Sequence, residues 1–238
     1  TSYADVGKLG YYRWLTATAG SARNVAAGAW VELDTTFNGW KPAKNYLVHG
    51  IWDYSINQPH TVLVCAVNER DSALSVCPTL SLLARDTHQR GTFPYADKVY
   101  DATTTIDTAY GIQQFPLAGN TTNDSNATGE DKTDGTSMTL AGNFGVNYRM
   151  HLASSYSDGK KLGWLINPRG GGWGGAIWAM PGILTGGKFL IPPDAGTTSD
   201  NTKGSVAGKY QTGHTAPWFQ FMPTGGSSFP VRFVAIPY

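Results

Sequence analysis

The sequence predicts an all-β protein, an antiparallel β-sandwich or jelly roll with about a dozen strands and little helix. Only 15% of the 238 residues are charged, below the roughly 25% of an average globular protein. Glycine (29 residues) and aromatic residues (12%) are abundant, a mixture that favours strands and tight turns over helices. Short apolar or alternating segments recur along the chain between turn-forming residues.

The strands are expected wherever these segments lie between Gly, Pro, Asn or Asp. In the first half we expect them at Tyr11–Ala17, Ala29–Leu33, Tyr46–Tyr54 and His60–Val67. The last two are expected to form a hairpin, and only Thr79–Arg85 has the pattern of a short helix. In the second half we expect strands at Tyr110–Phe115, Met138–Leu140, Phe144–Leu152, Leu162–Ile166, Ala176–Trp178, Lys188–Ile191, Trp218–Met222 and Pro230–Ile236.

One polar segment, Gly119–Ser137, contains almost nothing that could enter a core. We expect a single domain over residues 1–238 with a long, mobile loop at 119–137. The alternative is two small sandwiches, 1–118 and 138–238. The same segment holds three sequons, at Asn120, Asn123 and Asn126. They would carry glycans in a secreted eukaryotic protein, although a chain rich in Asn and Thr also produces sequons by chance.

Two cysteines, Cys65 and Cys77, allow two states. They can form a disulfide if a hairpin brings their Cα atoms within about 7 Å. Two buried free thiols are the more common state for a sparse pair in a reducing compartment. No second Cys-x-x-Cys or His pair completes a zinc site, so we expect no metal and no cofactor.

The charge and motif content excludes several functions. The net charge is +1, so no global field attracts nucleic acid or an anionic membrane. No apolar run approaches the ~20 residues of a membrane span. No triad, phosphate-loop or metal-binding motif is present, and we expect no enzyme. Paired carboxylates are the remaining catalytic pattern, and the candidates are Asp53, Glu69, Asp71 and Asp107.

Aromatic residues are the strongest positive feature. Trp40, Trp173, Trp178 and Trp218 lie in or beside Gly- or Pro-rich connections, where rigid rings suit both carbohydrate stacking and subunit interfaces. The densest glycine run, 167–178, has two interpretations. It is a recognition loop that presents Trp173, or a place where backbone packs closely against a neighbouring subunit.

The low charge, the run Gly170–Trp178 and the terminal strand in Phe229–Tyr238 together resemble bacteriophage virion surface proteins of the jelly-roll capsid, spike or tail-tip type. The resemblance implies a non-enzymatic virion protein that acts by self-assembly and surface presentation. Its partners would be copies of itself, as a trimer or higher oligomer, other virion proteins and a receptor such as a cell-surface glycan. The alternatives are a secreted, lectin-like carbohydrate-binding module and a paired-carboxylate glycoside hydrolase.

Overall fold

The computed structural model describes residues 3–18, 20–33, 50–68, 71–84, 90–101, 105–122, 124–169, 171–180, 188–190, 205–210 and 217–238. The chain forms two compact units. One comprises Thr1–Leu15 and Gln89–Tyr238 and is called here the two-sheet unit. The other is the Thr16–His88 unit. Neither boundary falls in the polar segment 119–137.

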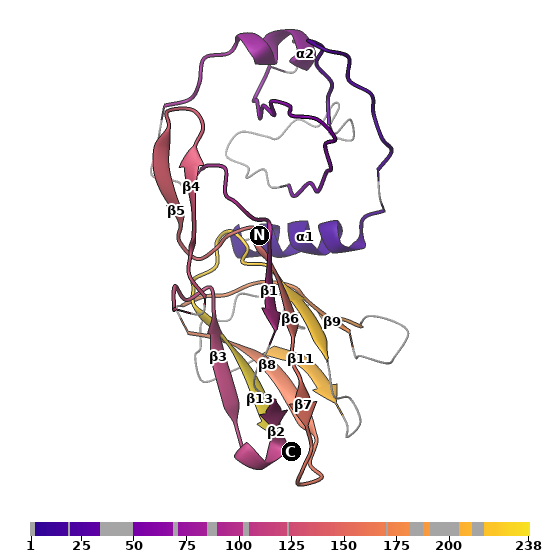
Figure 1. The fold of residues 1–238 in the computed structure, drawn as a ribbon, viewed down its shortest axis with the longest axis vertical. Helices are drawn as coiled ribbons and strands as arrows, with labels where there is room; N and C mark the ends of the chain where they lie inside the picture. The colour runs from indigo at the N-terminus through magenta and orange to yellow at the C-terminus, as the bar shows by residue number, and fades with distance from the viewer. Residues whose placement is uncertain are drawn as a thin grey trace. The chain divides into compact units, whose positions relative to one another are not determined.

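Strands dominate the described part of the two-sheet unit, which confirms the all-β class (Figure 1). One long helix, α1 (Tyr3–Thr16), begins in this unit, and a 3₁₀ helix spans Thr108–Tyr110. The strands are β1 (Asp97–Asp101), β2 (Ile106–Asp107), β3 (Gln113–Leu117), β4 (Ala127–Asp131), β5 (Thr136–Leu140), β6 (Asn147–His151), β7 (Ser154–Ser155), β8 (Leu162–Pro168), β9 (Ile177–Met180), β10 (Lys188–Leu190), β11 (Ser205–Tyr210), β12 (Trp218–Phe221) and β13 (Val231–Pro237).

Two sheets contain most of these strands. The five-stranded sheet has the order β1-β6-β12-β9-β10, and the four-stranded sheet has the order β11-β8-β13-β3. Eight of the nine strands pair antiparallel in a nested sequence: β3 with β13, β6 with β12, β8 with β11 and β9 with β10. Successive pairs fall in alternate sheets, and β1 joins the edge of β6 in parallel.

The inner faces of the two sheets share an aromatic core. Trp164 on β8 lies 5.3 Å, centroid to centroid, from Phe219 on β12 and from Phe233 on β13. Phe219 and Phe233 meet edge to face at 4.9 Å. All three side chains are fully buried. Rings of this size bury large apolar areas, and their offset and edge-on contacts add to the stabilisation.

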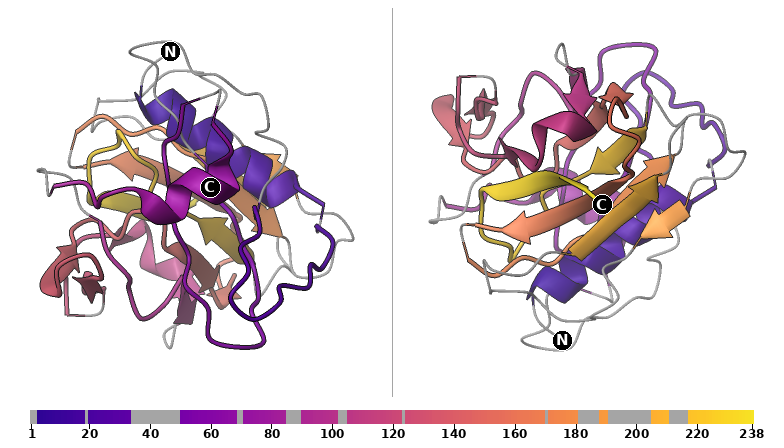
Figure 2. Two further views of the ribbon diagram at one scale, coloured as in Figure 1. Left: turned by 90° about the horizontal axis from the view of Figure 1, so that it is seen from above. Right: turned by 90° about the horizontal axis from the view of Figure 1, so that it is seen from below.

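The expected strand at Tyr11–Ala17 is wrong, because most of this segment belongs to α1. Its buried positions are 7, 8 and 11 and its exposed positions are 9, 13 and 16, and these spacings of three and four residues follow the period of a helix and not that of a strand. Tyr11 is fully buried, and its hydroxyl donates to Asn147 Oδ1 at 3.1 Å. This contact fixes the helix beside the start of β6 (Figure 2).

The Thr16–His88 unit contains only α2 (Ala73–Val76) and a 3₁₀ helix at Cys77–Thr79 among its described residues. The expected strands Ala29–Leu33 and His60–Val67 are not formed, nor is the described part of Tyr46–Tyr54, residues 50–54. The expected helix Thr79–Arg85 is also wrong, because residues 81–84 are irregular. Apolar strand-forming residues make a strand only where a partner strand receives their hydrogen bonds, and no described strand pairs with these segments.

The polar segment Gly119–Ser137 is not one long loop. It contains β4 and the start of β5, which pair as a hairpin from Ala127↔Leu140 to Asp131↔Thr136. Arg90 Nε donates to the buried Asp131 carboxylate at 2.7 Å, which ties the hairpin to the start of the two-sheet unit. Strands from both sides of the segment share each main sheet, since β1 pairs with β6 and β3 pairs with β13.

Candidate functional site

Two of the four aromatic candidates lie on neighbouring strands, and two do not belong to a described surface. Trp173 is only 1% exposed and packs 6.2 Å from Phe221, so its assignment as a surface ring is wrong. Trp40 lies outside the described residues. Trp178 lies on β9 and Trp218 on β12, and these two strands are hydrogen-bonded neighbours.

The glycine run around Trp173 packs against the chain's own loop before β13. Gly174 N donates to Ser227 Oγ at 3.2 Å, and Thr224 Oγ1 donates to Gly174 O at 2.8 Å. A Cβ atom on Gly175 would lie 2.4 Å from the Trp173 ring, so only glycine fits there. Close backbone packing therefore explains these glycines, and within the chain the neighbour is this loop.

The face of the five-stranded sheet that points away from the core is called here the outer face. On β12, Phe219 and Phe221 point into the core, so Trp218 and Gln220 point outward. Gln220 lies directly opposite Trp178 on β9 and Arg149 on β6. The outer face therefore carries two indole rings with an amide between them.

Trp218 is held by its neighbours in the ladder. The His151 ring on β6 stacks on the indole at a centroid distance of 4.6 Å and an angle of 18°. His151 Nδ1 lies 3.0 Å from Asp101 Oδ1 on β1, within hydrogen-bond distance. Trp218 still exposes 37% of its surface. The ring is thus fixed in orientation and accessible to a ligand.

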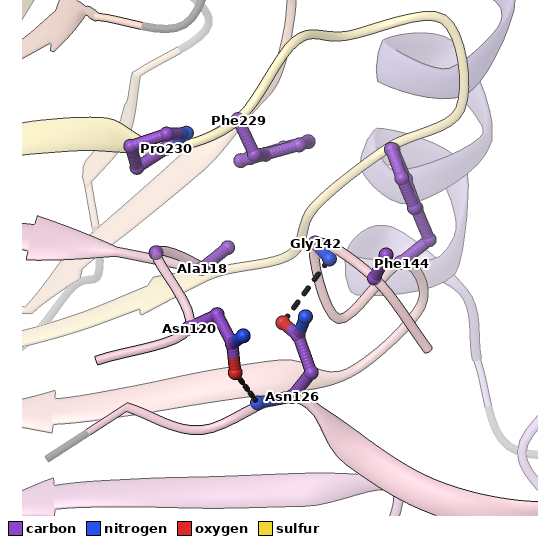
Figure 3. Close-up of a pocket in the computed structure, with 9 residues that line it drawn as sticks. Ala118, Asn120, Asn126, Gly142, Phe144, Phe229 and Pro230 are labelled. Atoms are coloured by element: carbon purple, nitrogen blue, oxygen red, sulfur yellow. Dashed lines mark hydrogen bonds between the residues drawn. The ribbon is translucent and has the colours of Figure 1, made fainter. Parts of the chain in front are cut away.

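A small pocket lies elsewhere on the same unit, with a volume of about 310 Å³ (Figure 3). It is lined by Ala118, Gly119, Asn120, Asn126, Ala141, Gly142, Phe144, Phe229 and Pro230. Figure 3 shows the two asparagines on one side and the two phenylalanine rings on the other. The rings meet edge to face at 5.2 Å. Four separate segments build this pocket, so no local sequence motif predicts it.

The amides of this pocket bear on the sequons. Asn126 Oδ1 accepts a hydrogen bond from Gly142 N at 3.2 Å, and Asn120 Oδ1 accepts one from Asn126 N at 3.2 Å. Both oxygens therefore fix the loop backbone. Asn123 lies outside the described residues. The sequon amides thus have a structural role in shaping the pocket wall.

A buried polar network anchors the polar segment beside the pocket. The Asp124 carboxylate accepts hydrogen bonds from Lys98 Nζ at 2.5 Å, Ala118 N at 2.5 Å and Tyr148 OH at 2.9 Å. Asn143 Nδ2 donates to Tyr148 OH at 2.7 Å. Burial raises the pKa of Tyr148, and the nearby Asp124 charge raises it further. The network keeps Tyr148 protonated as a donor to the carboxylate.

The catalytic carboxylate candidates do not form a described site. Asp53 and Asp71 are exposed in the Thr16–His88 unit, and Glu69 lies outside the described residues. Asp107 caps the 3₁₀ helix by accepting from Ala109 N at 2.8 Å, and it also accepts from Ser157 Oγ at 2.6 Å. The Ser157 bond and then the Ala109 bond lower the pKa of Asp107. Its hydrogen bonds give it a structural role as a helix cap.

The two cysteines are paired as a disulfide, with Cα atoms 5.8 Å apart. The favoured state of two free thiols is therefore wrong. The bond joins an irregular segment to the 3₁₀ helix that begins at Cys77, without the hairpin on which the disulfide alternative depended. Across the described ranges, no group of three or more His, Cys, Asp or Glu side chains is placed to hold a metal ion. Nor does any helix in that part of the chain have the length and apolar character needed to cross a membrane.

Comparisons with protein-family models, curated proteins and solved structures found no match to this chain.

Proposed function

We propose that this chain is a non-enzymatic structural subunit of a virion, a jelly-roll protein of the capsid, decoration, spike or tail-tip class. It acts by self-assembly into a trimer or higher oligomer and by surface presentation. The observation that carries the proposal is the nested pairing of eight antiparallel strands in two sheets.

This pairing order is the one that a jelly roll requires. A long antiparallel hairpin of four strand pairs, rolled so that alternate pairs meet in one sheet, gives the two orders β3-β13-β8-β11 and β6-β12-β9-β10. Jelly rolls recur in viral capsid proteins, in lectins and in cupins. The order therefore favours the virion and lectin readings of the sequence over a generic β fold.

The filled interior argues for a structural role. Trp164, Phe219 and Phe233 occupy the space between the sheets and are fully buried. A cupin-type enzyme keeps room for a ligand or metal in its barrel, and a closely packed aromatic core leaves no such room. The chemistry of this chain is therefore expected on its surfaces.

The Thr16–His88 unit supports assembly. None of its described residues is buried, and Val64 and Leu83 are 99% and 83% exposed. Large apolar side chains gathered in one segment mark a surface that another protein covers. In a virion subunit, contacts with neighbouring copies would bury these side chains, and the low charge of the chain limits the desolvation cost of such contacts.

Light scattering and negative-stain electron microscopy of the purified full chain test the proposal. We expect a discrete assembly of at least three copies of the 25.6 kDa chain. Changing Val64 and Leu83 together to Asp should dissociate it, whereas Ile112→Asp, at an exposed apolar site of the two-sheet unit, should not. A strict monomer at every concentration would overturn the proposal.

A lectin-like, carbohydrate-binding module is the second candidate. The position of the half-buried Trp178 beside the exposed Trp218 on one face of the sheet favours it, and a virion subunit that binds a receptor combines both functions. A glycan-binding monomer that never assembles would favour this candidate alone.

A further inference from the structure

The outer face of the five-stranded sheet has the composition of a ligand platform. Trp218 and Trp178 are diagonal neighbours on adjacent antiparallel strands, because Gln220, two residues from Trp218, lies opposite Trp178. Diagonal neighbours have Cα atoms ~7–8 Å apart and present their side chains on one face. Planar rings at this spacing offer two adjacent stacking surfaces.

Polar groups that make no hydrogen bond with another described residue lie between and beside these rings. The Gln220 amide makes no hydrogen bond with another described residue, and neither do the indole N–H groups of Trp178 and Trp218. Gln220 and Trp178 are half-buried. An apolar protein surface placed over them would leave these groups without hydrogen bonds, which is unfavourable. The pattern therefore suits a ligand that is itself rich in hydroxyl groups.

The charges of the face are compensated locally. Arg149 Nη2 lies 3.3 Å from Asp97 Oδ2, and His151 is hydrogen-bonded to Asp101. The Arg149 guanidinium thus has an acidic partner within the same sheet, and the His151 ring has a hydrogen-bond partner there. The described side chains of the face thus leave no unpaired charge to select an anionic ligand or a cationic one, which favours a neutral partner.

We propose that the outer face binds a neutral carbohydrate chain, with adjacent sugar rings stacked on Trp218 and Trp178 and their hydroxyl groups bonded to Gln220 and Arg149. The C–H face of a pyranose is apolar and flat, so it matches an indole, and its equatorial hydroxyls match the amide and the guanidinium. The stacked His151 ring keeps the Trp218 indole in position before the ligand arrives, which lowers the entropy cost of binding. This inference names a ligand for surface presentation, and it stands independently of whether the chain assembles into a virion.

The test is a glycan array of neutral and sialylated oligosaccharides probed with the purified full chain, followed by titration of the best ligand. We expect neutral glycans to bind, with an affinity that added salt leaves unchanged. Trp218→Ala and Trp178→Ala should each weaken binding by about tenfold or more, and Gln220→Ala by about fivefold. Trp30→Ala, which removes an exposed Trp from the Thr16–His88 unit, is the matched control and should bind as the wild type does.

Trp218→Phe guards against a folding defect, because it keeps a stacking ring and should retain most of the binding. Several results would overturn the inference. The first is that the wild type binds no glycan on the array. The second is that both tryptophan variants still bind as the wild type does. The third is that only charged glycans bind, with an affinity that falls as salt is added. Loss of assembly without any glycan binding in Trp218→Ala would show instead that the face joins two copies of the chain. Light scattering on the same variants separates this outcome from a failure of the proposed assembly function.

Discussion

The two-sheet unit and the Thr16–His88 unit use similar residues in opposite ways. In the two-sheet unit, the rings of Trp164 and Phe233 stack on one another and are fully buried. In the Thr16–His88 unit, Trp30 and Trp52 are 47% and 49% exposed, and no described residue is buried. Composition therefore does not decide burial. Strand pairing does, and among the described residues it occurs only in the two-sheet unit.

The difference indicates where each part obtains its stability. Buried apolar area contributes roughly 25 cal/mol per Å², and all the described residues that are buried lie in the two-sheet unit. The Thr16–His88 unit must order its backbone without that gain, and its one covalent constraint among the described residues is the Cys65–Cys77 disulfide. It is the part that assembly would complete.

Limited proteolysis should show the largest contrast. Trypsin should cut at the exposed Arg23 at least about tenfold faster than at Arg149 or Arg232, because β6 and β13 must unfold before a protease can bind them. Mass spectrometry of the fragments over time measures this ratio. Equal rates at the three sites would remove the distinction between the units.

A matched pair of tryptophan substitutions tests the same contrast energetically. Trp164→Ala should lower the free energy of unfolding by about 3–5 kcal/mol, because it empties the centre of the aromatic core. Trp30→Ala should change it by less than about 0.5 kcal/mol. Urea denaturation followed by circular dichroism measures both values. A comparable loss in Trp30→Ala would show that the Thr16–His88 unit has a core of its own.

Asp124→Ala should be nearly as damaging as Trp164→Ala, at about 3 kcal/mol, because Lys98 Nζ, Ala118 N and Tyr148 OH lose their shared acceptor. The control is Glu130→Ala, which removes an exposed ion pair with Lys132 and should cost at most about 1 kcal/mol. Thermal unfolding of both variants gives the comparison. Equal losses would mean that the buried network does not anchor the polar segment.

The smallest expected effect is on the pH dependence of stability at low pH. Hydrogen bonds from Arg90, then from Thr133, hold the pKa of Asp131 well below its usual range. A carboxyl group with a lowered pKa in the folded state stabilises the protein above its unfolded pKa, and this stabilisation is lost as the pH falls below about 4. The melting temperature of Asp131→Asn should therefore depend less on pH in this range than that of the wild type. Parallel profiles would contradict the assignment.

The sequence predicted the strands with clear alternation or long apolar runs, such as β6, β8, β12 and β13. It failed where the physical signal is not local. The segment of α1 contains β-favouring residues such as Tyr11 and Trp14, so its local pattern predicts a strand. The burial of these residues depends on the sheet beside them. Trp173 was placed on the surface because its glycine neighbours resemble a loop, although those glycines permit close packing.

The sites show the same division. The sequence predicts Trp178 and Trp218 as binding residues, but only the register of β9 and β12 places them on one face. The pocket of Asn120, Asn126 and Phe229 was not foreseen, because its walls come from distant segments. Both features depend on contacts between distant segments, which no local sequence pattern encodes.

The most direct test of the account is hydrogen exchange, measured by mass spectrometry on the free 25.6 kDa protomer and on the assembled protein. We expect the amides of β6, β12 and β13 to be protected in both states. We expect the amides in 50–68 and 71–84 to exchange rapidly in the protomer and to become protected on assembly. Strong protection of those amides in the free protomer, or none in the assembly, would contradict it.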